Sequence, residues 1–430
     1  MSSLDSPQSL VRCALVNLGC RVNHAEIEAM RLALEDENIA VTDSGKAQVV
    51  VVNTCAVTGE AEAKSRKAIR RLASKPSIQA IYVTGCAANL FEEEFTSLAN
   101  NVVYVPDKRS IPERIKQDAT APAESVDPHG LSNSSPARMR REIKIQDGCN
   151  NTCSYCIVRV ARGPSHSVPV QEILQQARRA SSDGIGEIVL AGINLGQFRL
   201  DEEFANSTGV KVDATSLTTL IHHLLAELPL ARIRLSSIEP TDIDPSLIDL
   251  MAQNPQRIAA YLHIPLQSGS NTILKAMSRP YTVQDFQKTV NAIRQKLPHI
   301  ALATDIIVGF PGETDENFME TYEFAKRLQF SKIHLFRYSL RPGTPAANRT
   351  DQIAPEIKAE RAHNLQKLAD SMRYQHAQGL KGSVAQVYVE SPGRGKSEGL
   401  FEAKIPKEAP LGTIYAAPVS DVREDCLICQ

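Results

Sequence analysis

The stretch EIKIQDGCNNTCSYC, residues 142–156, is the feature around which the rest of this sequence is organised. It places Cys149, Cys153 and Cys156 close together, directly after a short run of alternating apolar residues. Cysteine thiolates hold iron–sulfur clusters, and a four-iron cube usually takes four of them. Three thiolates leave one iron open, as a catalytic metal site keeps a position for a small molecule. The spacing therefore predicts a 4Fe-4S cluster with one open iron.

A zinc site is the main alternative for these thiols. A zinc finger needs a second pair of ligands nearby, and the next Cys or His in the chain is His166. Gly148 and the segment NNT at 150–152 suit a loop wrapped around a cube, because Gly and Asn tolerate tight, left-handed turns. The sequence favours the cluster.

This motif resembles the signature of the radical S-adenosylmethionine (SAM) enzymes, in which an aromatic residue precedes the last cysteine. Here that residue is Tyr155. The resemblance implies that SAM binds the open iron through its amino and carboxylate groups, and that an electron from the cluster cleaves SAM to a 5'-deoxyadenosyl radical. The spacing does not say what the radical attacks.

Length and composition predict a soluble protein of several domains. At roughly 150 residues per domain, 430 residues suggest three. With 42% hydrophobic residues, the chain has no apolar run approaching a membrane span, and its first residues, MSSLDSPQSL, do not form a secretory signal. Nine cysteines, partly at metal-binding spacing, fit a reducing compartment, so we expect a cytoplasmic protein. A net charge of −1 gives no global argument for nucleic acid.

Residues 11–117 alternate short apolar strands with helical patterns, which predicts an α/β domain with a parallel sheet. Three of these strands end in a cysteine, at Cys20, Cys55 and Cys86. Ligands of open parallel sheets gather outside the carboxyl ends of the strands. We therefore expect these thiols to lie close together, although any one of them, taken singly, could be a small buried hydrophobe.

The segments NLGCRVNHAE, VVNTCAVTGEAEAKSRKAIRR and YVTGCAAN resemble the N-terminal domain of the methylthiotransferases. These are radical SAM enzymes that carry a second 4Fe-4S cluster on three such cysteines. The resemblance extends over nearly the whole chain. It implies a methylthiotransferase domain over 11–117 and a catalytic, metal-binding set of six residues: Cys20, Cys55, Cys86, Cys149, Cys153 and Cys156. Residues 118–137 are polar and rich in Pro and Ser, which is typical of a linker.

The helix expected after Cys55 carries a basic face, made of Lys64, Arg66, Lys67, Arg70 and Arg71. Residues three and four apart share a helix face, and such a face can neutralise the phosphates of RNA. A solvated helix would show the same pattern. The run Arg138, Arg140, Arg141 and Lys144 carries the same ambiguity.

Residues 138–370 contain six strand–helix units, with apolar strands expected over 142–146, 187–191, 232–236, 259–264, 301–308 and 332–338. This predicts a (β/α)6 partial TIM barrel of radical SAM type, with its active site on the loops after the strands. By resemblance those loops hold SAM. The expected cofactor contacts are Tyr155, Asn194, Glu239, Gln267 and Ser268.

Two local features refine the resemblance. GINLG, from Gly192, looks like the branch of the family that acts on threonylcarbamoyladenosine in tRNA. After the cluster motif, related enzymes tend to read P-x-x-R-G-x-x-R-S-R, and this chain instead has Arg159, His166 and Val168 at three of those positions. Arg162 and Gly163 remain. If the arginines of the family pattern contact substrate or SAM, this chain lacks those contacts at His166 and Val168.

The segment 380–430 reads as short alternating strands, which predicts a small β-domain. It resembles the TRAM domain, a small barrel that binds tRNA in this family. Cys426 and Cys429 form a terminal C-x2-C without a partner pair, and we assign them no role.

The expected activity is therefore transfer of a methylthio group to C2 of N6-threonylcarbamoyladenosine beside the tRNA anticodon. The resemblance implies two 4Fe-4S clusters, SAM, a reduced electron donor such as flavodoxin or ferredoxin, and a sulfur source, with no membrane partner. Alternatives are the same reaction on isopentenyladenosine in tRNA or on a ribosomal-protein side chain, and a non-catalytic iron–sulfur protein that binds RNA.

Overall fold

The computed structural model describes residues 11–118, 140–210, 212–213, 215–228 and 231–430. The chain forms two compact units, one of residues 1–138 with 160–162 and the other of 139–159 with 163–430. Apart from Asp118, the expected linker lies outside the described residues. No helix in the described ranges is both long enough and apolar enough to cross a membrane.

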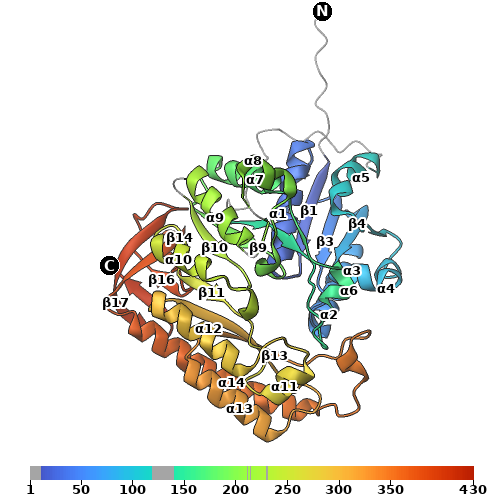
Figure 1. The fold of residues 1–430 in the computed structure, drawn as a ribbon. Helices are drawn as coiled ribbons and strands as arrows, with labels where there is room; N and C mark the ends of the chain where they lie inside the picture. The colour runs from blue at the N-terminus through green and yellow to red at the C-terminus, as the bar shows by residue number, and fades with distance from the viewer. Residues whose placement is uncertain (1–10, 119–139, 211, 214, 229–230) are drawn as a thin grey trace, which may run out of the picture. The chain divides into compact units, whose positions relative to one another are not determined.

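The first unit is built on a five-stranded parallel sheet, as predicted for residues 11–117. Its order is β2-β1-β3-β4-β5, drawn in blue to cyan in Figure 1. The strands are β1 (Arg12–Asn17), β2 (Ala40–Val41), β3 (Val49–Thr54), β4 (Ala80–Gly85) and β5 (Val102–Tyr104). All of β3 is buried, as expected of a central parallel strand covered on both faces.

Helices connect these strands and cover the sheet. They are α1 (Arg21–Asp36), α2 (Gly59–Ala73), α3 (Cys86–Leu90), α4 (Glu92–Thr96), the 3-10 helix η1 (Lys108–Ser110) and α5 (Ile111–Asp118). Helix α2 begins at an N-cap, where the Thr58 side chain accepts a hydrogen bond from the Ala61 N–H. Glu60 lies in its first turn and Arg71 in its last, which suits the helix dipole.

The second unit contains six parallel strands that curve into a partial barrel, which confirms the predicted (β/α)6 architecture. They are β6 (Arg140–Lys144), β9 (Glu187–Ala191), β10 (Arg232–Leu235), β11 (Tyr261–His263), β12 (Ala301–Val308) and β13 (Lys332–Arg337). Two three-stranded sheets, β10-β9-β6 and β11-β12-β13, meet through single parallel bridges such as Ser237 to His263.

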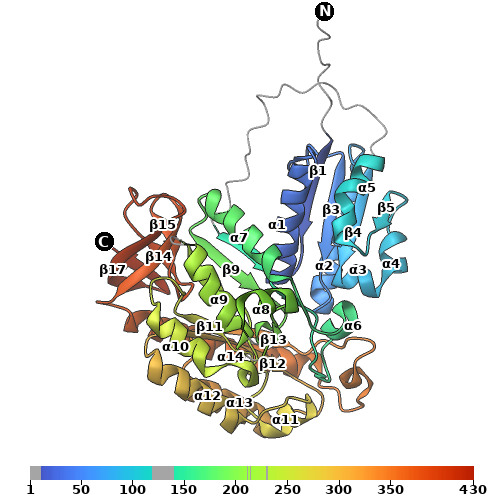
Figure 2. The same ribbon diagram turned by 45° about the horizontal axis from the view of Figure 1, so that its top comes forward.

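Helices cover the outside of this partial barrel, as the two views in Figures 1 and 2 show. They are α7 (Val170–Ser182), α8 (Glu202–Thr208), α9 (Ser216–Glu227), α10 (Pro245–Gln253), α11 (Asn271–Ala276), α12 (Val283–Lys296), α13 (Asp315–Leu328) and α14 (Pro355–Gly379). Their apolar faces and the strands form one continuous core, which includes Leu190, Phe286 and Leu302.

The last segment closes into a small antiparallel-rich barrel, which confirms the predicted β-domain. Its strands are β14 (Val384–Ser391), β15 (Arg394–Lys396), β16 (Glu402–Lys404), β17 (Ile414–Arg423) and β18 (Cys426–Cys429), in the order β14-β15-β16-β18-β17. Closure leaves no free sheet edge. Its core, which includes Val387, Phe401 and Leu427, is separate from that of the partial barrel.

A buried carboxylate joins the two barrels of the second unit. Glu187 is completely buried and accepts from Arg232 Nε at 2.6 Å and from Arg234 Nε at 2.8 Å. The same two arginines donate to backbone carbonyls of the small barrel, Arg232 to Gln386 at 3.0 Å and Arg234 to Glu398 at 2.7 Å. The small barrel is therefore held to the partial barrel by charged hydrogen bonds.

The basic run before the cluster motif also forms ion pairs within the second unit. Arg140 pairs with Glu187 at 2.9 Å, and Arg141 pairs with Asp183 at 2.7 Å. Both arginines lie in β6, where burial demands a partner for each charge. These pairs favour the structural alternative for both arginines, and Lys144 likewise pairs with Asp147 at 3.0 Å. Arg138 lies outside the described residues.

Candidate active site

The loop with Cys149, Cys153 and Cys156 follows β6 and the short strand β7 (Gln146–Asp147), at the C-terminal end of the partial barrel. Gly148 opens this loop with a φ of +65°, and a Cβ there would lie 2.0 Å from the Pro164 carbonyl oxygen. Only glycine fits, as the sequence suggested for a tight turn.

Backbone contacts hold the loop in place. The Ser154 N–H donates to the Met277 carbonyl at 3.0 Å and its hydroxyl donates to the Ala276 carbonyl at 2.8 Å. The Ser154 carbonyl accepts from Ala346 N–H at 2.9 Å. The middle of the loop is thus fixed to the end of α11 and to the segment after β13, so the cysteines on either side are preorganised.

The donor set of this loop fits an iron–sulfur cluster. All three cysteines are free thiols and partly exposed. Burial, together with the nearby Cys153 and Cys149, raises the pKa of Cys156 to about 12, so the three thiols are close enough to interact. A cysteine binds a metal as the thiolate, so binding of a cluster would release these protons despite the raised pKa. Among the described residues, no three His, Cys, Asp or Glu side chains are arranged to hold a single metal ion.

An arginine that sequence reasoning missed lies beside these sulfurs. Arg279 Nη1 is 3.1 Å from the Cys153 sulfur, and its Nε donates to the Tyr281 hydroxyl at 3.0 Å. Its remaining nitrogen forms an ion pair with Glu239. Burial raises the pKa of Glu239 despite this cation. Arg279 is 126 residues from Cys153, and no sequence pattern marks the contact.

Asn194 organises the loops after β9 and β10. Its side-chain oxygen accepts from the backbone N–H groups of Gly196 and Glu239, both at 3.2 Å, and its nitrogen donates to Asp242 at 2.5 Å. The side chain is almost fully buried. In the structure, Asn194 therefore holds the backbone that carries Glu239.

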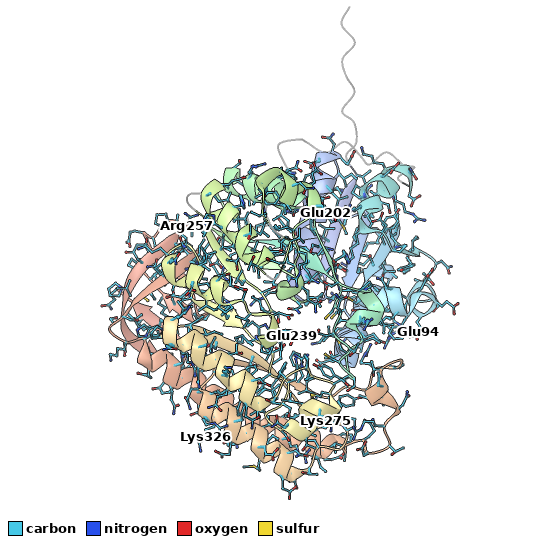
Figure 3. The ribbon with its side chains drawn as sticks, viewed as in Figure 1. Glu94, Glu202, Glu239, Arg257, Lys275 and Lys326 are labelled. Carbon is cyan, nitrogen blue, oxygen red and sulfur yellow. The ribbon has the colours of Figure 1, made fainter. Side chains whose placement is uncertain are left out.

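Figure 3 labels Glu239 together with Lys275 and Lys326, which lie on the outer helices α11 and α13.

Gln267 and Ser268 follow β11. Gln267 adopts a φ of +68° while its N–H donates to the Asp305 carbonyl at 2.7 Å. The Ser268 hydroxyl lies 3.1 Å from that of Thr321 and is completely buried. Ser268 thus fastens this loop to α13.

Tyr155 packs edge-on against Phe310, with ring centroids 6.5 Å apart. A polar pair on the barrel strands, which the sequence did not single out, joins His263 Nε2 to Asp305 Oδ1 at 2.9 Å. The His334 ring lies 5.3 Å from that of His263. The structure therefore adds two histidines to the strands that carry the predicted contacts.

The second set of cysteines lies at one edge of the first unit's sheet. Cys20, Cys55 and Cys86 follow β1, β3 and β4, which are neighbouring parallel strands. Burial raises the pKa of Cys55 to about 11, and Cys20 and Cys86 contribute to that rise, so the three thiols are close to one another. The donor set matches that of the first loop.

Glycines before two of these cysteines allow close backbone approach. Gly85 has a φ of +93°, and a Cβ there would lie 2.3 Å from Asn53 Oδ1. A Cβ at Gly19 would lie 2.3 Å from the side chain of Asn23. The glycines of NLGC and VTGC are therefore required by packing.

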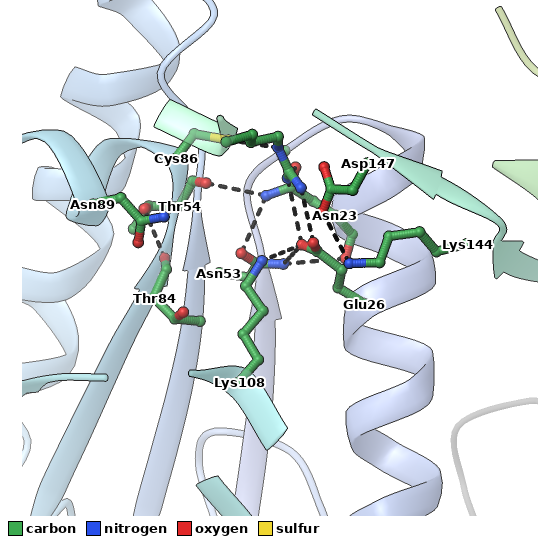
Figure 4. Close-up of polar contacts among 12 residues, drawn as sticks. Asn23, Glu26, Asn53, Thr54, Thr84, Cys86, Asn89, Lys108, Lys144 and Asp147 are labelled. Carbon is green, nitrogen blue, oxygen red and sulfur yellow. Dashed lines mark hydrogen bonds and ion pairs between the residues drawn. The ribbon is translucent and has the colours of Figure 1, made fainter. Parts of the chain in front are cut away.

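A polar network supports this edge of the sheet (Figure 4). Asn23 donates to Asn53 Oδ1 at 3.2 Å and to the Thr54 carbonyl at 3.0 Å. Asn53 in turn donates to Glu26 at 3.1 Å, and Glu26 forms an ion pair with Lys108. These hydrogen bonds link α1, whose N-cap is Cys20, to β3, which Cys55 follows.

The basic face of α2 is present, but its residues differ in whether they pair with a glutamate. Lys64 pairs with Glu60 at 2.9 Å, and Arg66 pairs with Glu62. Lys67, Arg70 and Arg71 are exposed. Lys64 is exposed as well, but its charge is shared with Glu60. Lys67, Arg70 and Arg71 are therefore the exposed cations of this face for which the described contacts give no carboxylate partner.

The three departures from the family pattern have different surroundings. Arg159 and His166 are exposed, whereas Val168 packs against the core of the partial barrel. Cys426 and Cys429 alternate between partly exposed and buried along β18, so they face opposite sides of that strand.

Comparison with known proteins agrees with this geometry. Residues 143–325 match the Radical SAM superfamily, and residues 12–106 match a family described as Uncharacterized protein family UPF0004. A solved radical S-adenosylmethionine methyltransferase, TsrM from Kitasatospora setae, shares the fold, with a TM-score of 0.54, 16% identity, and coverage of 79% of this chain and 77% of that one. The fold and the three-cysteine loop therefore define a radical SAM enzyme, which implies SAM and a 4Fe-4S cluster as cofactors.

Curated relatives narrow the class. The threonylcarbamoyladenosine tRNA methylthiotransferase MtaB of Bacillus subtilis is 37% identical over 88% of this chain and 84% of its own length. The MtaB of Thermotoga maritima is 34% identical, over 86% and 85%. The tRNA-2-methylthio-N(6)-dimethylallyladenosine synthase of Agrobacterium fabrum is also 34% identical, over 87% of this chain and 86% of its own length. The chain belongs to the radical SAM methylthiotransferase family.

Proposed function

We propose that this protein transfers a methylthio group to C2 of N6-threonylcarbamoyladenosine beside the anticodon of tRNA. The observation that carries the proposal is the pair of three-cysteine sites, each at the C-terminal ends of parallel strands. Cys149, Cys153 and Cys156 would hold the cluster that binds SAM, and Cys20, Cys55 and Cys86 a second 4Fe-4S cluster. When bound, these cofactors supply radical chemistry for a C–H bond that no side-chain base removes at neutral pH.

The protein's own residues orient the reactants. We assign Arg279 to fix Cys153 and the Glu239 carboxylate in one arrangement, since it contacts both. Glu239 and Gln267 are retained as direct SAM contacts, with Tyr155 beside the last cysteine. Asn194 acts by holding the Glu239 backbone, and Ser268 by fastening its loop to α13, because their polar atoms are engaged there.

The tRNA substrate is supported by three features. Relatives that act on tRNA match over most of their own length. Lys67, Arg70 and Arg71 offer exposed positive charge for phosphates, and small closed barrels commonly bind oligonucleotides. Bases in single-stranded loops splay out readily, as an enzyme acting on C2 requires. The proposal places the protein in the cytoplasm, with flavodoxin or ferredoxin as electron donor and a separate sulfur source.

Threonylcarbamoyladenosine is preferred over isopentenyladenosine because of GINLG and the first two relatives above. Isopentenyladenosine is the second candidate, because the Agrobacterium fabrum enzyme is as similar as one of the MtaB proteins. A ribosomal-protein side chain is less well supported, since exposed cations such as Arg70 suit RNA.

The test is expression in a bacterial host that lacks its own tRNA methylthiotransferases, followed by mass spectrometry of tRNA nucleosides. Cys149→Ala and Cys55→Ala each remove one cluster ligand. Cys426→Ala is the matched control, because this partly exposed thiol lies in the small barrel.

The expected result is methylthio-threonylcarbamoyladenosine with the wild type and Cys426→Ala, and none with the two site variants. Methylthio-isopentenyladenosine instead would keep the reaction and refute the substrate. No methylthio nucleoside, from protein with full iron content, would refute a tRNA substrate.

A further inference from the structure

One arginine in the first unit is aimed at a cysteine sulfur. Arg162 belongs to that unit together with the two residues before it, and its Nε lies 3.0 Å from the Cys86 sulfur. Its Nη1 pairs with Glu26 Oε1 at 2.8 Å, and its Nη2 donates to Asn23 Oδ1 at 3.1 Å. Nη2 also lies 3.4 Å from Glu26 Oε2, so all three guanidinium nitrogens are engaged.

The partners of Arg162 are themselves fixed. The side chains of Arg162 and Glu26 are only 5% and 4% exposed. Glu26 also pairs with Lys108 and accepts from Asn53 at 3.1 Å. A buried ion pair is weak evidence for stability, because desolvation offsets its attraction. The network is better explained by what it holds in place, which is the guanidinium beside Cys86.

The contact is specific to one of the three sulfurs. The Cys20 sulfur lies 3.2 Å from Asn23 Oδ1, an acceptor that carries no charge. Cys55 interacts with the Val57 backbone. Among the contacts that the structure describes, Cys86 is the cysteine of this set whose sulfur receives a cationic donor.

We propose that Arg162 is a positioning residue of the second cluster, whose Nε–H donates to the Cys86 thiolate and raises the reduction potential of the cluster held by Cys20, Cys55 and Cys86. The inference rests on the proposed function, since it requires that cluster. Hydrogen bonds to ligating sulfurs stabilise the more negative, reduced state of a cluster, and partners beyond the ligands tune metal centres.

Arginine suits this role better than lysine. Its planar fork presents N–H groups in fixed directions, so one can meet sulfur while the others meet Glu26 and Asn23. A lysine ammonium would keep the charge but would lose that shared orientation. The two residues are therefore expected to differ in their effect on the cluster.

The experiment uses the full chain with Cys149→Ala, Cys153→Ala and Cys156→Ala, so that any cluster signal comes from the second site. In this background Arg162→Gln, Arg162→Lys and Arg66→Gln are compared by redox titration monitored by electron paramagnetic resonance. Arg66 is the matched control, because it is an arginine of the same unit whose ion-pair partners are the carboxylates of Glu62 and Glu94.

The expected result is a lower midpoint potential for Arg162→Gln, a smaller decrease for Arg162→Lys, and no change for Arg66→Gln. Arg162→Lys keeps the test decisive if Arg162→Gln fails to fold. Equal potentials in a loaded cluster would overturn the role of Arg162 and leave the proposed function standing. Absence of iron from Cys20, Cys55 and Cys86 in the parent background would overturn the second cluster, and this inference with it.

Discussion

The Arg234 guanidinium lies 2.8 Å from the Glu187 carboxylate, and both side chains are almost completely excluded from solvent. Arg232 approaches the same carboxylate and donates onward to the small barrel. Glu187 is therefore the shared acceptor through which the partial barrel and the small barrel are connected. Its removal would leave buried arginines without their counter-charge.

We expect Glu187→Gln to destabilise the protein by about 3–5 kcal/mol, the usual effect of removing one partner of a buried ion pair. The measurement is urea unfolding followed by circular dichroism. Glu402→Gln is the control, because its pair with Lys396 is largely exposed and is worth only about 0–1 kcal/mol. Similar losses for the two variants would contradict a special role for Glu187.

Acid should weaken the same connection. Burial by itself raises the pKa of Glu187, but Arg234, Arg232 and Arg140 together hold that pKa well below its ordinary value. A carboxylate with a lowered folded-state pKa stabilises the protein above its unfolded pKa of about 4.3, and loses that contribution as the pH falls toward the folded value. Unfolding measured between pH 7 and pH 3 should therefore show a steeper loss below about pH 4 in the wild type than in Glu187→Gln. Parallel curves would show that Glu187 does not carry this dependence.

Gly85→Ala tests the packing before Cys86. The new Cβ would lie 2.3 Å from Asn53 Oδ1 in a backbone conformation with a φ of +93°, so β4 or Asn53 must move. We expect a loss of about 1–3 kcal/mol and reduced iron at the second site, because Cys86 follows directly.

Gly209→Ala separates strain from crowding, because Gly209 also has a positive φ, of +71°, but nothing lies within 4 Å of its Cβ position. Both variants are assayed for iron content and thermal unfolding. Gly209→Ala should lose stability only and keep its full iron content. Full iron content in Gly85→Ala would contradict the requirement for close approach at β4.

Much of this architecture could be predicted because burial leaves a local pattern. The strands at 187–191 and 301–308 form as predicted, since each is a short apolar run. The gathering of Cys20, Cys55 and Cys86 follows from one rule of parallel sheets, that neighbouring strands end at the same edge.

The contacts that could not be predicted join residues far apart in the chain. Arg162 and Cys86 are 76 residues apart, and Arg279 and Cys153 are 126 apart. Nothing in the local sequence distinguishes Arg279 from a surface cation, and the family pattern that includes Arg162 does not indicate its partner. Arg140 is an example of the opposite kind. It lies in a basic run that could have bound RNA, but it pairs with the buried Glu187 of the neighbouring strand β9. Such pairings depend on tertiary structure, which no spacing rule encodes.

The exposed cations of α2 provide the last prediction. Lys67, Arg70 and Arg71 are exposed, and so is Lys64, but Lys64 and the half-buried Arg66 are paired with glutamates of the same helix. We expect Lys67→Glu/Arg70→Glu/Arg71→Glu to weaken tRNA binding by at least about tenfold at moderate salt, because each phosphate that is no longer neutralised keeps its counterions. The dependence of log K on log salt should flatten by about one for each such phosphate.

Filter binding of tRNA at low and at moderate salt measures both quantities. The control replaces Lys326 and Arg327 of α13 by Glu, since Lys326 is also an exposed helix cation, with a side chain 58% exposed. If the control loses affinity in proportion to its smaller change in charge, two cations replaced against three, the effect is one of net charge. If neither does, the α2 face is a solvated helix surface, and tRNA must be bound elsewhere on the protein.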